Sequence, residues 1–168
     1  MNGNIIKISH FPKGTPKDTV LTKTRTVLDN ICRSCTVEED IASGNYVLDA
    51  EFLVDSGGLW NELVEESILK CQLDYGTEIF VIKKVKKQSK YISVTAVQMT
   101  IHACNTLWLE DVRPTNTNGQ GALSHMLTNA VGKKKEIVLQ SNISVTNTAY
   151  YQRKRLQEAL LGADNSFI

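Results

Sequence analysis

The sequence predicts a mainly β protein with helices (α+β), built as a small antiparallel β-barrel with edge helices, plus the start of a second domain. Two observations lead to this fold class. Residues 46–54 alternate strictly between apolar and mostly polar side chains, which is the period of a strand with one buried face. Several other segments are rich in β-branched residues and end at short turns, whereas only three segments have helical spacing.

The first strand is predicted over residues 4–11, where Ile6 and Ile8 share one face. The following stretch, FPKGTPKD, contains two prolines and a glycine and therefore interrupts the regular structure. Residues 19–33 are rich in threonine and valine, which favours extended structure or long loops.

A β-hairpin is the clearest local prediction. Residues 46–54 form its second strand, and SGN (residues 43–45) supplies the turn. The first strand of the hairpin is marked by Cys35, Val37 and Ile41.

The apolar spacing changes to a helical period after the hairpin. Residues 58–71 are predicted to form an amphipathic helix, which Asp55 or Ser56 can cap. Its apolar positions are Leu59, Trp60, Leu63, Val64 and Ile68. Two strands follow, at residues 78–87 and 90–101, with a short polar turn between them.

The segment NTNGQGALSHML predicts a second amphipathic helix. Asn118 is suited to cap its start, and Gly132 to end it. One face repeats at a spacing of four, through Ala122, Met126 and Ala130 and through Leu123, Leu127 and Val131. Beyond it, residues 135–145 predict another strand, and residues 147–164 predict a helix that Gly162 ends.

The composition fits a folded protein and excludes several classes. Of the 168 residues 42% are hydrophobic and 22% charged, and the net charge of +1 gives no global field that favours nucleic acid or acidic lipid. No apolar run is long enough to span a bilayer, and the N-terminus lacks the apolar core of a signal peptide. We therefore expect synthesis in a cytoplasm without export by the general secretory route.

The glycine turn before the second helix could in principle hold a phosphate. A P-loop requires G-x-x-x-x-G-K-[ST], and a dinucleotide fingerprint requires a third glycine and a parallel sheet. NGQGALSH has neither pattern, so the turn at Gly119 is interpreted as a connector that lets the backbone enter the helix.

Cys32 and Cys35 form a CxxC pair, CRSC. A zinc site would need two more ligands, for which Cys71, Cys104 and His102 are candidates if the fold gathers them. A redox pair should lie between a strand and a helix, whereas the residues after this pair favour extended structure. Buried free thiols are therefore the favoured interpretation.

Two groups of residues could suggest an enzyme. The histidines are scattered and lack a triad partner; they are His10, His102 and His125. Asp49 and Glu51 lie on the polar face of the hairpin, and could work as acid and base with their neighbours across the hairpin. These neighbours are Glu38 and Asp40. The period-two rule alone explains a charged, wet face, so a small hydrolase with an acidic site is kept only as an alternative.

Three basic clusters lie near tyrosines in the sequence. They are Lys83–Lys87, Lys133–Lys135 and Arg153–Arg155, with Tyr91, Tyr150 and Tyr151. An OB-like barrel that binds single-stranded nucleic acid would use such charge and stacking, here through Lys83, Lys84, Lys86, Lys87 and Tyr91. Acidic residues balance the bases, and lysines also protect strand edges, so this remains a second alternative.

The order of these motifs resembles a known family. The chain contains, in order, the hairpin and the motif WNELVEESILK. These are followed by YGTEIFVIKKVKKQSKYISVTAVQMTIHACNTLWLEDVRP and then by NGQGALSHML. Over about residues 35–130 this is similar to the N-terminal region of tail-tip proteins of Gram-positive siphophages and prophages, variously named minor structural proteins, prophage tail endopeptidases or tail-associated lysins. One departure is Gln98, where family members often carry a histidine soon after the alanine, and the aromatic-acid-leucine run that follows is replaced.

The resemblance implies a structural role. Such proteins are similar to the baseplate hub of contractile phages, in which a β-barrel interrupted by a second domain surrounds the tail channel in three copies. Residues 4–132 would be the β-barrel hub domain with two helices, and residues 133–168 the start of an inserted, truncated second domain. The expected partners are further copies of the chain (a homotrimer when full length), the distal tail protein and the tape-measure protein, with no membrane and no specific nucleic acid.

The resemblance also implies where the protein acts and which residues it lacks. We expect a virion tail-tip location after synthesis in the bacterial host cytoplasm. Peptidase or lysin activity, where a member has it, would lie in C-terminal segments, so no catalytic, cofactor-binding or metal-binding residue and no cofactor is expected here. The final NSFI then corresponds to a fragment boundary inside the second domain.

Overall fold

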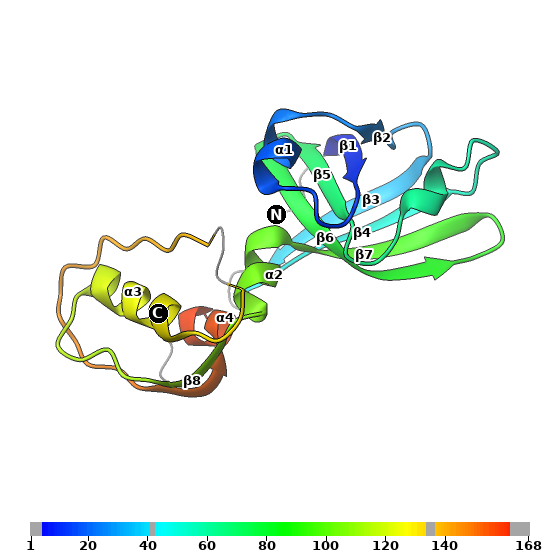
Figure 1. Ribbon diagram of the computed structural model, residues 1–168. Coiled ribbons are helices and arrows are strands. Elements are labelled where there is room, and N and C mark those ends of the chain that lie inside the picture. The colour runs from blue at the N-terminus through cyan, green and yellow to red at the C-terminus, as the bar shows by residue number, and fades with distance from the viewer. Residues whose placement is uncertain (1–4, 41–42, 134–136, 162–168) are drawn as a thin grey trace. The chain divides into compact units, whose positions relative to one another are not determined.

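The computed structural model describes residues 5–40, 43–133 and 137–161. The protein is mainly β with four short α-helices, which confirms the fold class expected from the sequence. It divides into two compact units (Figure 1). The first unit comprises Met1–Ile41 and Asn45–Met99, and the second comprises Ala42–Gly44 and Thr100–Ile168. The chain passes into the second unit at Thr100. The domains expected from the sequence, residues 4–132 and 133–168, stay predictions.

The first unit is built on one antiparallel sheet of seven strands. In chain order these strands are β1 (Ile5–Phe11), β2 (Thr26–Val27), β3 (Cys32–Asp40), β4 (Asn45–Leu53), β5 (Ile68–Leu73), β6 (Gly76–Lys87) and β7 (Tyr91–Gln98). Their order in the sheet is β2-β1-β5-β6-β7-β4-β3, and neighbouring strands are antiparallel. The predicted hairpin is confirmed as β3 and β4, in which Val37 pairs with Leu48.

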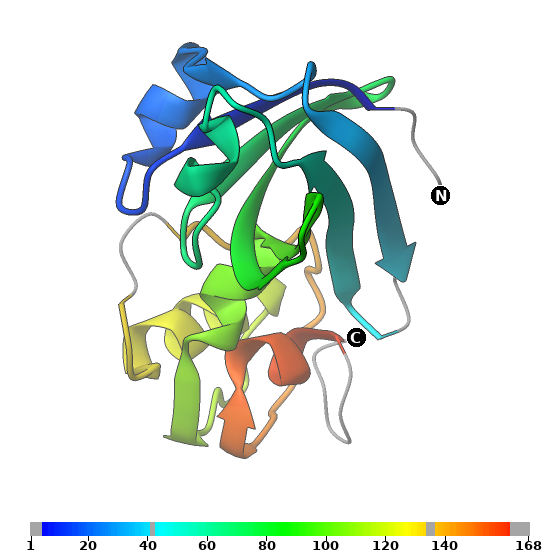
Figure 2. The same ribbon diagram turned by 90° about the vertical axis from the view of Figure 1, so that its right-hand side faces the viewer.

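The sheet curls into a half-barrel, because its two edge strands follow one another in the chain. Only residues 28–31 separate the end of β2 from the start of β3 (Figure 2). The Leu28 N–H donates to the carbonyl oxygen of Ile8 at 3.0 Å, and the Leu53 N–H donates to the carbonyl oxygen of Ile31 at 2.7 Å. This turn, which we call the seam, therefore hydrogen-bonds to a strand near each edge.

The concave face of the sheet holds the main core. Its fully buried side chains come from central and outer strands alike, and include Leu48, Phe52, Leu69, Phe80 and Ile82. Leu28 and Ile31 of the seam belong to the same cluster. On the other face, the helix α1 (Lys17–Thr22) places Val20 against Phe11, Ile68 and Ile79. The half-barrel thus carries a short helix on its second face.

The prediction of a helix over residues 58–71 is wrong. The structure has a short 3-10 helix, η1 (Leu59–Glu62), and then strand β5. Glu66 takes a left-handed conformation with φ of 67°, which no α-helix accommodates. Residues after it pair with β1 on one side and β6 on the other, so ladder hydrogen bonds override the helical spacing.

Other boundaries also differ from the sequence prediction. A helix, α1, forms where extended structure or a loop was expected, and helix α2 (Met99–Asn105) begins inside the predicted strand 90–101. Residues 147–164 were expected to be one helix, but the structure has strand β9 (Tyr151–Arg155) followed by helix α4 (Leu156–Leu161). Several predicted features lie outside the described residues: Ile41, Lys134, Lys135, Gly162 and Asn165–Ile168.

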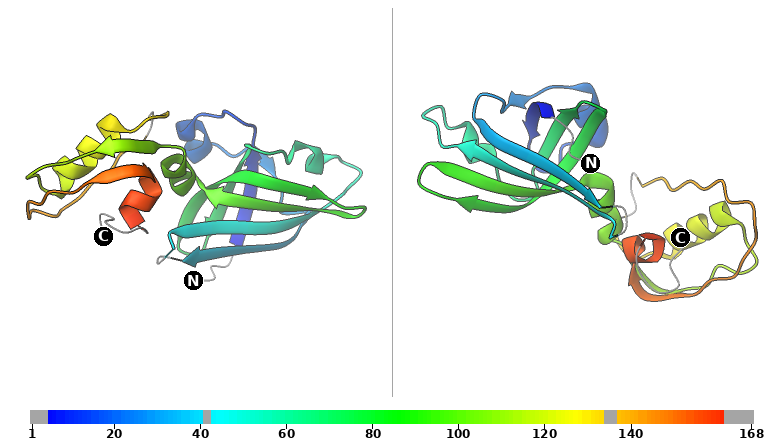
Figure 3. Two further views of the ribbon diagram at one scale, coloured as in Figure 1. Left: turned by 90° about the horizontal axis from the view of Figure 1, so that it is seen from below. Right: turned by 180° about the vertical axis from the view of Figure 1, so that it is seen from behind.

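The second unit contains a two-stranded sheet and a helix on its own core. Strand β8 (Trp108–Val112) pairs with β9, and helix α3 (Gly119–Asn129) confirms the second predicted helix with Asn118 as its cap. The buried cluster includes Leu107, Leu109, Met126, Tyr151 and Leu156. Residues 137–150, which we call the extended segment, run past α3 without joining a sheet (Figure 3). The described part of the strand predicted over residues 135–145 is therefore extended chain, and not a sheet strand.

Candidate functional site

The glycines at the start of α3 allow the extended segment to cross the helix. Asn118 Oδ1 accepts a hydrogen bond from the Gly121 N–H at 2.8 Å, and the Gly119 N–H donates to the carbonyl oxygen of Ile143 at 3.0 Å. A Cβ added at Gly119 would lie 2.8 Å from the Cβ of Ile143. Since two of the N-terminal N–H groups already have protein partners, this turn packs chain against helix, as the connector interpretation requires.

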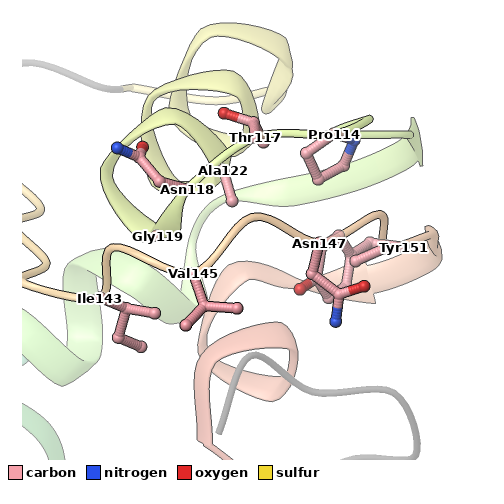
Figure 4. Close-up of a pocket in the computed structure, with 10 residues that line it drawn as sticks. Pro114, Thr117, Asn118, Gly119, Ala122, Ile143, Val145, Asn147 and Tyr151 are labelled. Atoms are coloured by element: carbon pink, nitrogen blue, oxygen red, sulfur yellow. The ribbon is translucent and has the colours of Figure 1, made fainter.

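A pocket of about 200 Å³ opens beside this turn (Figure 4). Three stretches line it: the loop and start of α3, the extended segment, and β9. The lining residues are Pro114, Thr117, Asn118, Gly119, Ala122, Ile143, Val145, Asn147, Ala149 and Tyr151. No charged side chain is among them, so the pocket suits a small uncharged apolar group such as a side chain of a partner protein.

The extended segment exposes apolar side chains next to this pocket. Val138 is 78% exposed, Val145 is 74% exposed and Ile143 is 46% exposed. The amide of Gln120 binds the segment to α3, since its Nε2 donates to the Leu139 carbonyl oxygen at 3.2 Å and its Oε1 accepts from the Ser141 N–H at 3.0 Å. Backbone hydrogen bonds also hold the segment, between Thr117 and Asn147 and from the Gly119 N–H to the Ile143 carbonyl oxygen. Backbone groups of this strand-like stretch that lie outside these contacts are available to another strand.

The acidic residues proposed for a hydrolase lie on the outer face of the half-barrel. A depression of about 280 Å³ there is lined by Ser34, Thr36, Asp49, Ala50, Glu51, Ser93, Val94 and Thr95. The carboxylate of Asp49 accepts from the Thr95 hydroxyl at 2.6 Å, and Glu51 lies 3.6 Å from the guanidinium of Arg33. Glu38 and Asp40 do not line it. Each central carboxylate therefore has a structural partner, and the face needs no catalytic role to explain it.

The basic cluster on β6 is also engaged within the molecule. Lys83 forms an ion pair with Glu66, and Lys87 Nζ lies 3.8 Å from the centre of the Trp60 ring. The ring of Tyr91 is covered by the guanidinium of Arg33 at 5.4 Å. Aromatic faces that could stack on bases thus already bind cations of the same chain, which disfavours the nucleic-acid alternative.

Tyr150, which lies near another basic cluster in the sequence, also binds a cation of the same chain. The Arg113 guanidinium lies 4.4 Å from the centre of the Tyr150 ring and binds both carboxylate oxygens of Asp111. This hydrogen bonding to Arg113 holds the pKa of Asp111 below its ordinary value. Tyr151, by contrast, is buried in the core of the second unit, where no base can reach it.

His10 takes part in a contact that the sequence did not indicate. Its Nδ1 lies 3.2 Å from Glu62 Oε2, which also accepts from the Thr26 hydroxyl at 3.0 Å. Burial lowers the pKa of His10, and the negative charge of Glu62 opposes this change. No local signal joins His10 to Glu62, because β1 and η1 lie far apart in the chain. Of the other histidines, His125 is exposed on α3 and His102 lies on α2.

The cysteines fall into two groups. Cys32, Cys35 and Cys71 belong to the core of the first unit or pack against it, whereas Cys104 lies in the core of the second unit. The described residues include no group of three or more metal-ligating side chains placed to hold a metal ion. Cys32 and Cys35 nevertheless both pack against the same core, which the geometry of a regular strand does not predict.

Comparison with known proteins adds no family. No protein-family model matches the chain, and no curated protein is similar to it. Among the described helices, none has the length and apolar character to cross a membrane.

Proposed function

We propose that the chain is a structural component of a phage or prophage tail tip. In this proposal its copies form a ring around the tail channel and attach to the distal tail ring. The first support is the resemblance over about residues 35–130. Most of its motifs lie on the hairpin β3–β4, the strands β6 and β7 and the helix α3. The motif WNELVEESILK, expected as a helix, instead begins in η1 and ends in β5.

The observation that carries the proposal is the uncovered extended segment of the second unit. Val138 and Val145 expose about three quarters of their surface, beside a pocket lined without charge. Exposed apolar surface of this kind is used between protein subunits. Its strand-like backbone can also add to an edge strand of a neighbour. Both features favour an assembly role over a role that depends on reactive side chains.

The ring requires a heterologous interface, in which two different surfaces of the chain meet. The extended segment with its pocket supplies one apolar surface. We assign the distal tail protein and the tape-measure protein as further partners, on the resemblance alone.

The mass of the protein in solution tests the proposal. At increasing concentration, sedimentation velocity should show a species of three chains. The double substitution Val138→Asp and Val145→Asp places two charges in an apolar contact. It should weaken the association by about a hundredfold or more, which corresponds to a loss of about 3 kcal/mol in binding free energy. Val64→Asp is the matched control, since Val64 is an exposed valine of the first unit at 51%. A chain that stays monomeric at the highest concentration contradicts the ring.

A further inference from the structure

The CxxC pair lies across a β-bulge in strand β3. In a regular strand, residues three positions apart point to opposite faces of the sheet. Here Cys32 pairs with Phe52 and Ser34 pairs with Glu51, so one extra residue of β3, Arg33, has been inserted into the ladder. Cys35 then pairs with Ala50, which points to the same face as Phe52.

The bulge therefore brings both thiols to the concave face. Both are partly buried against the core, and the Cys32 thiol donates to the Ser34 carbonyl oxygen at 3.6 Å. Cys32 is also the first residue after the seam, where its N–H donates to the carbonyl oxygen of Leu28 at 3.0 Å. The thiol pair is thus located where the two edges of the half-barrel meet.

The two thiols differ in reactivity. The hydrogen bond from Cys35 lowers the pKa of Cys32, whereas the same hydrogen bond and burial raise the pKa of Cys35. Cys71 is fully buried, and desolvation raises its pKa. Cys32 therefore provides the more reactive thiolate, and Cys35 is the neighbour placed to resolve a bond formed at Cys32.

We propose that Cys32 and Cys35 are a reversible thiol–disulfide site that bridges the bulge at the start of β3, next to the seam of the half-barrel. The co-reactant is a small disulfide of the glutathione class. The Cys32 thiolate attacks one sulfur of the oxidant, whose S–S bond breaks, and one thiol leaves. Cys35 then loses its proton and attacks Cys32 Sγ, and the second thiol leaves. The protein loses two electrons and two protons, and the oxidant becomes two thiols.

The bulge also determines how stable this disulfide is. A disulfide requires the sulfurs to approach to about 2.05 Å, which is closer than a hydrogen-bonded thiol pair. Because the ladder is already interrupted at Arg33, this movement costs fewer hydrogen bonds here than elsewhere in the strand. A glutathione buffer should therefore close and open this disulfide without loss of the sheet.

Tryptic mapping of the full chain tests the site, because Arg33 lies between the two cysteines. Native protein is oxidised with glutathione disulfide, the remaining thiols are alkylated, and the digest is analysed by mass spectrometry. We expect peptides 26–33 and 34–70 to be joined, and to separate after reduction. Cys71 and Cys104 lie on two other tryptic peptides, so the pairing is unambiguous.

Three variants distinguish this pairing from others. Cys104→Ala should keep the linked peptides, whereas Cys35→Ser should replace them with a glutathione adduct on peptide 26–33. Cys32→Ser should abolish the link and leave Cys35 largely unmodified. This variant tests the pairing independently if Cys35→Ser does not fold. A native chain whose peptides 26–33 and 34–70 remain separate after oxidation, or a link from Cys32 to Cys71, would overturn the proposal.

Discussion

The two units of this protein differ in whether their extended segments pair with neighbouring strands. In the first unit, the strands join one seven-stranded sheet, and the most exposed large apolar side chains among its described residues, Val64 and Tyr75, reach 51%. In the second unit, the extended segment joins no sheet and exposes Val138 to 78%. The comparison teaches that β-branched sequence yields a strand only where the fold supplies a neighbouring strand. Without one, the same kind of sequence remains an accessible surface.

The largest expected effect is confined to the half-barrel and tests whether the two units are separate. Phe52→Ala removes a fully buried ring from the first core, and should lower the free energy of unfolding of that unit by about 3–5 kcal/mol. The chain has two tryptophans, Trp60 in the first unit and Trp108 in the second. Urea denaturation of the variants Trp60→Phe and Trp108→Phe therefore reports each unit through the remaining tryptophan.

We expect the transition seen by Trp60 to shift to lower urea while that seen by Trp108 keeps its midpoint. An equal shift of both transitions would show one cooperative body, and would break the comparison between two units.

A smaller effect is expected where α3 meets the extended segment. Gly119→Ala forces a Cβ against Ser141 and Ile143, which should displace the segment and cost about 1–3 kcal/mol. The measurements are the Trp108 transition and the amide hydrogen exchange of Ser141 and Ile143, which should become faster. His125→Ala is the control, because it changes an exposed residue of the same helix. Unchanged amide protection at Ile143 would mean that the segment does not depend on this crossing.

The smallest effect concerns pH and again belongs to the first unit. Burial lowers the pKa of His10 below its ordinary value of 6.5, so the unfolded chain takes up this proton at higher pH than the folded chain. The free energy of unfolding should therefore hold above pH 6.5 and fall as the pH drops through the window below it. His10→Asn should flatten this part of the curve for the Trp60 transition. Glu62→Gln should extend the fall to lower pH, because it removes the charge that favours protonated His10.

The sequence predicted those elements whose partners are close in the chain. The β3–β4 hairpin follows from strict alternation and a short turn, and α3 follows from its periodic face and the cap at Asn118. Residues 58–71 had helical spacing too, yet Ile68–Leu73 became β5 because β1 and β6 pair with it. The identity of those two neighbours depends on the complete topology, which no local period contains.

The candidate site shows the same limit. The turn at Gly119 packs against the extended segment, but nothing in the sequence indicated that residues 137–150 would be the chain crossing it. The packing of Cys32 and Cys35 against the same core was also not predictable, since a regular strand places such residues on opposite faces. Only the register of β3 on β4, with its extra residue Arg33, places the thiols on one face.

The seam has a consequence for the order in which the protein folds. Residues 28–31 join the two edges locally, but each edge reaches the middle of the sheet through distant pairs, such as Ser9 with Lys70 and Asp49 with Thr95. Pairs between distant residues carry a large loop-closure entropy and form slowly. We therefore expect the hairpins β3–β4, β5–β6 and β6–β7 to arise first, and the docking of β4 on β7 and β1 on β5 to limit the folding rate.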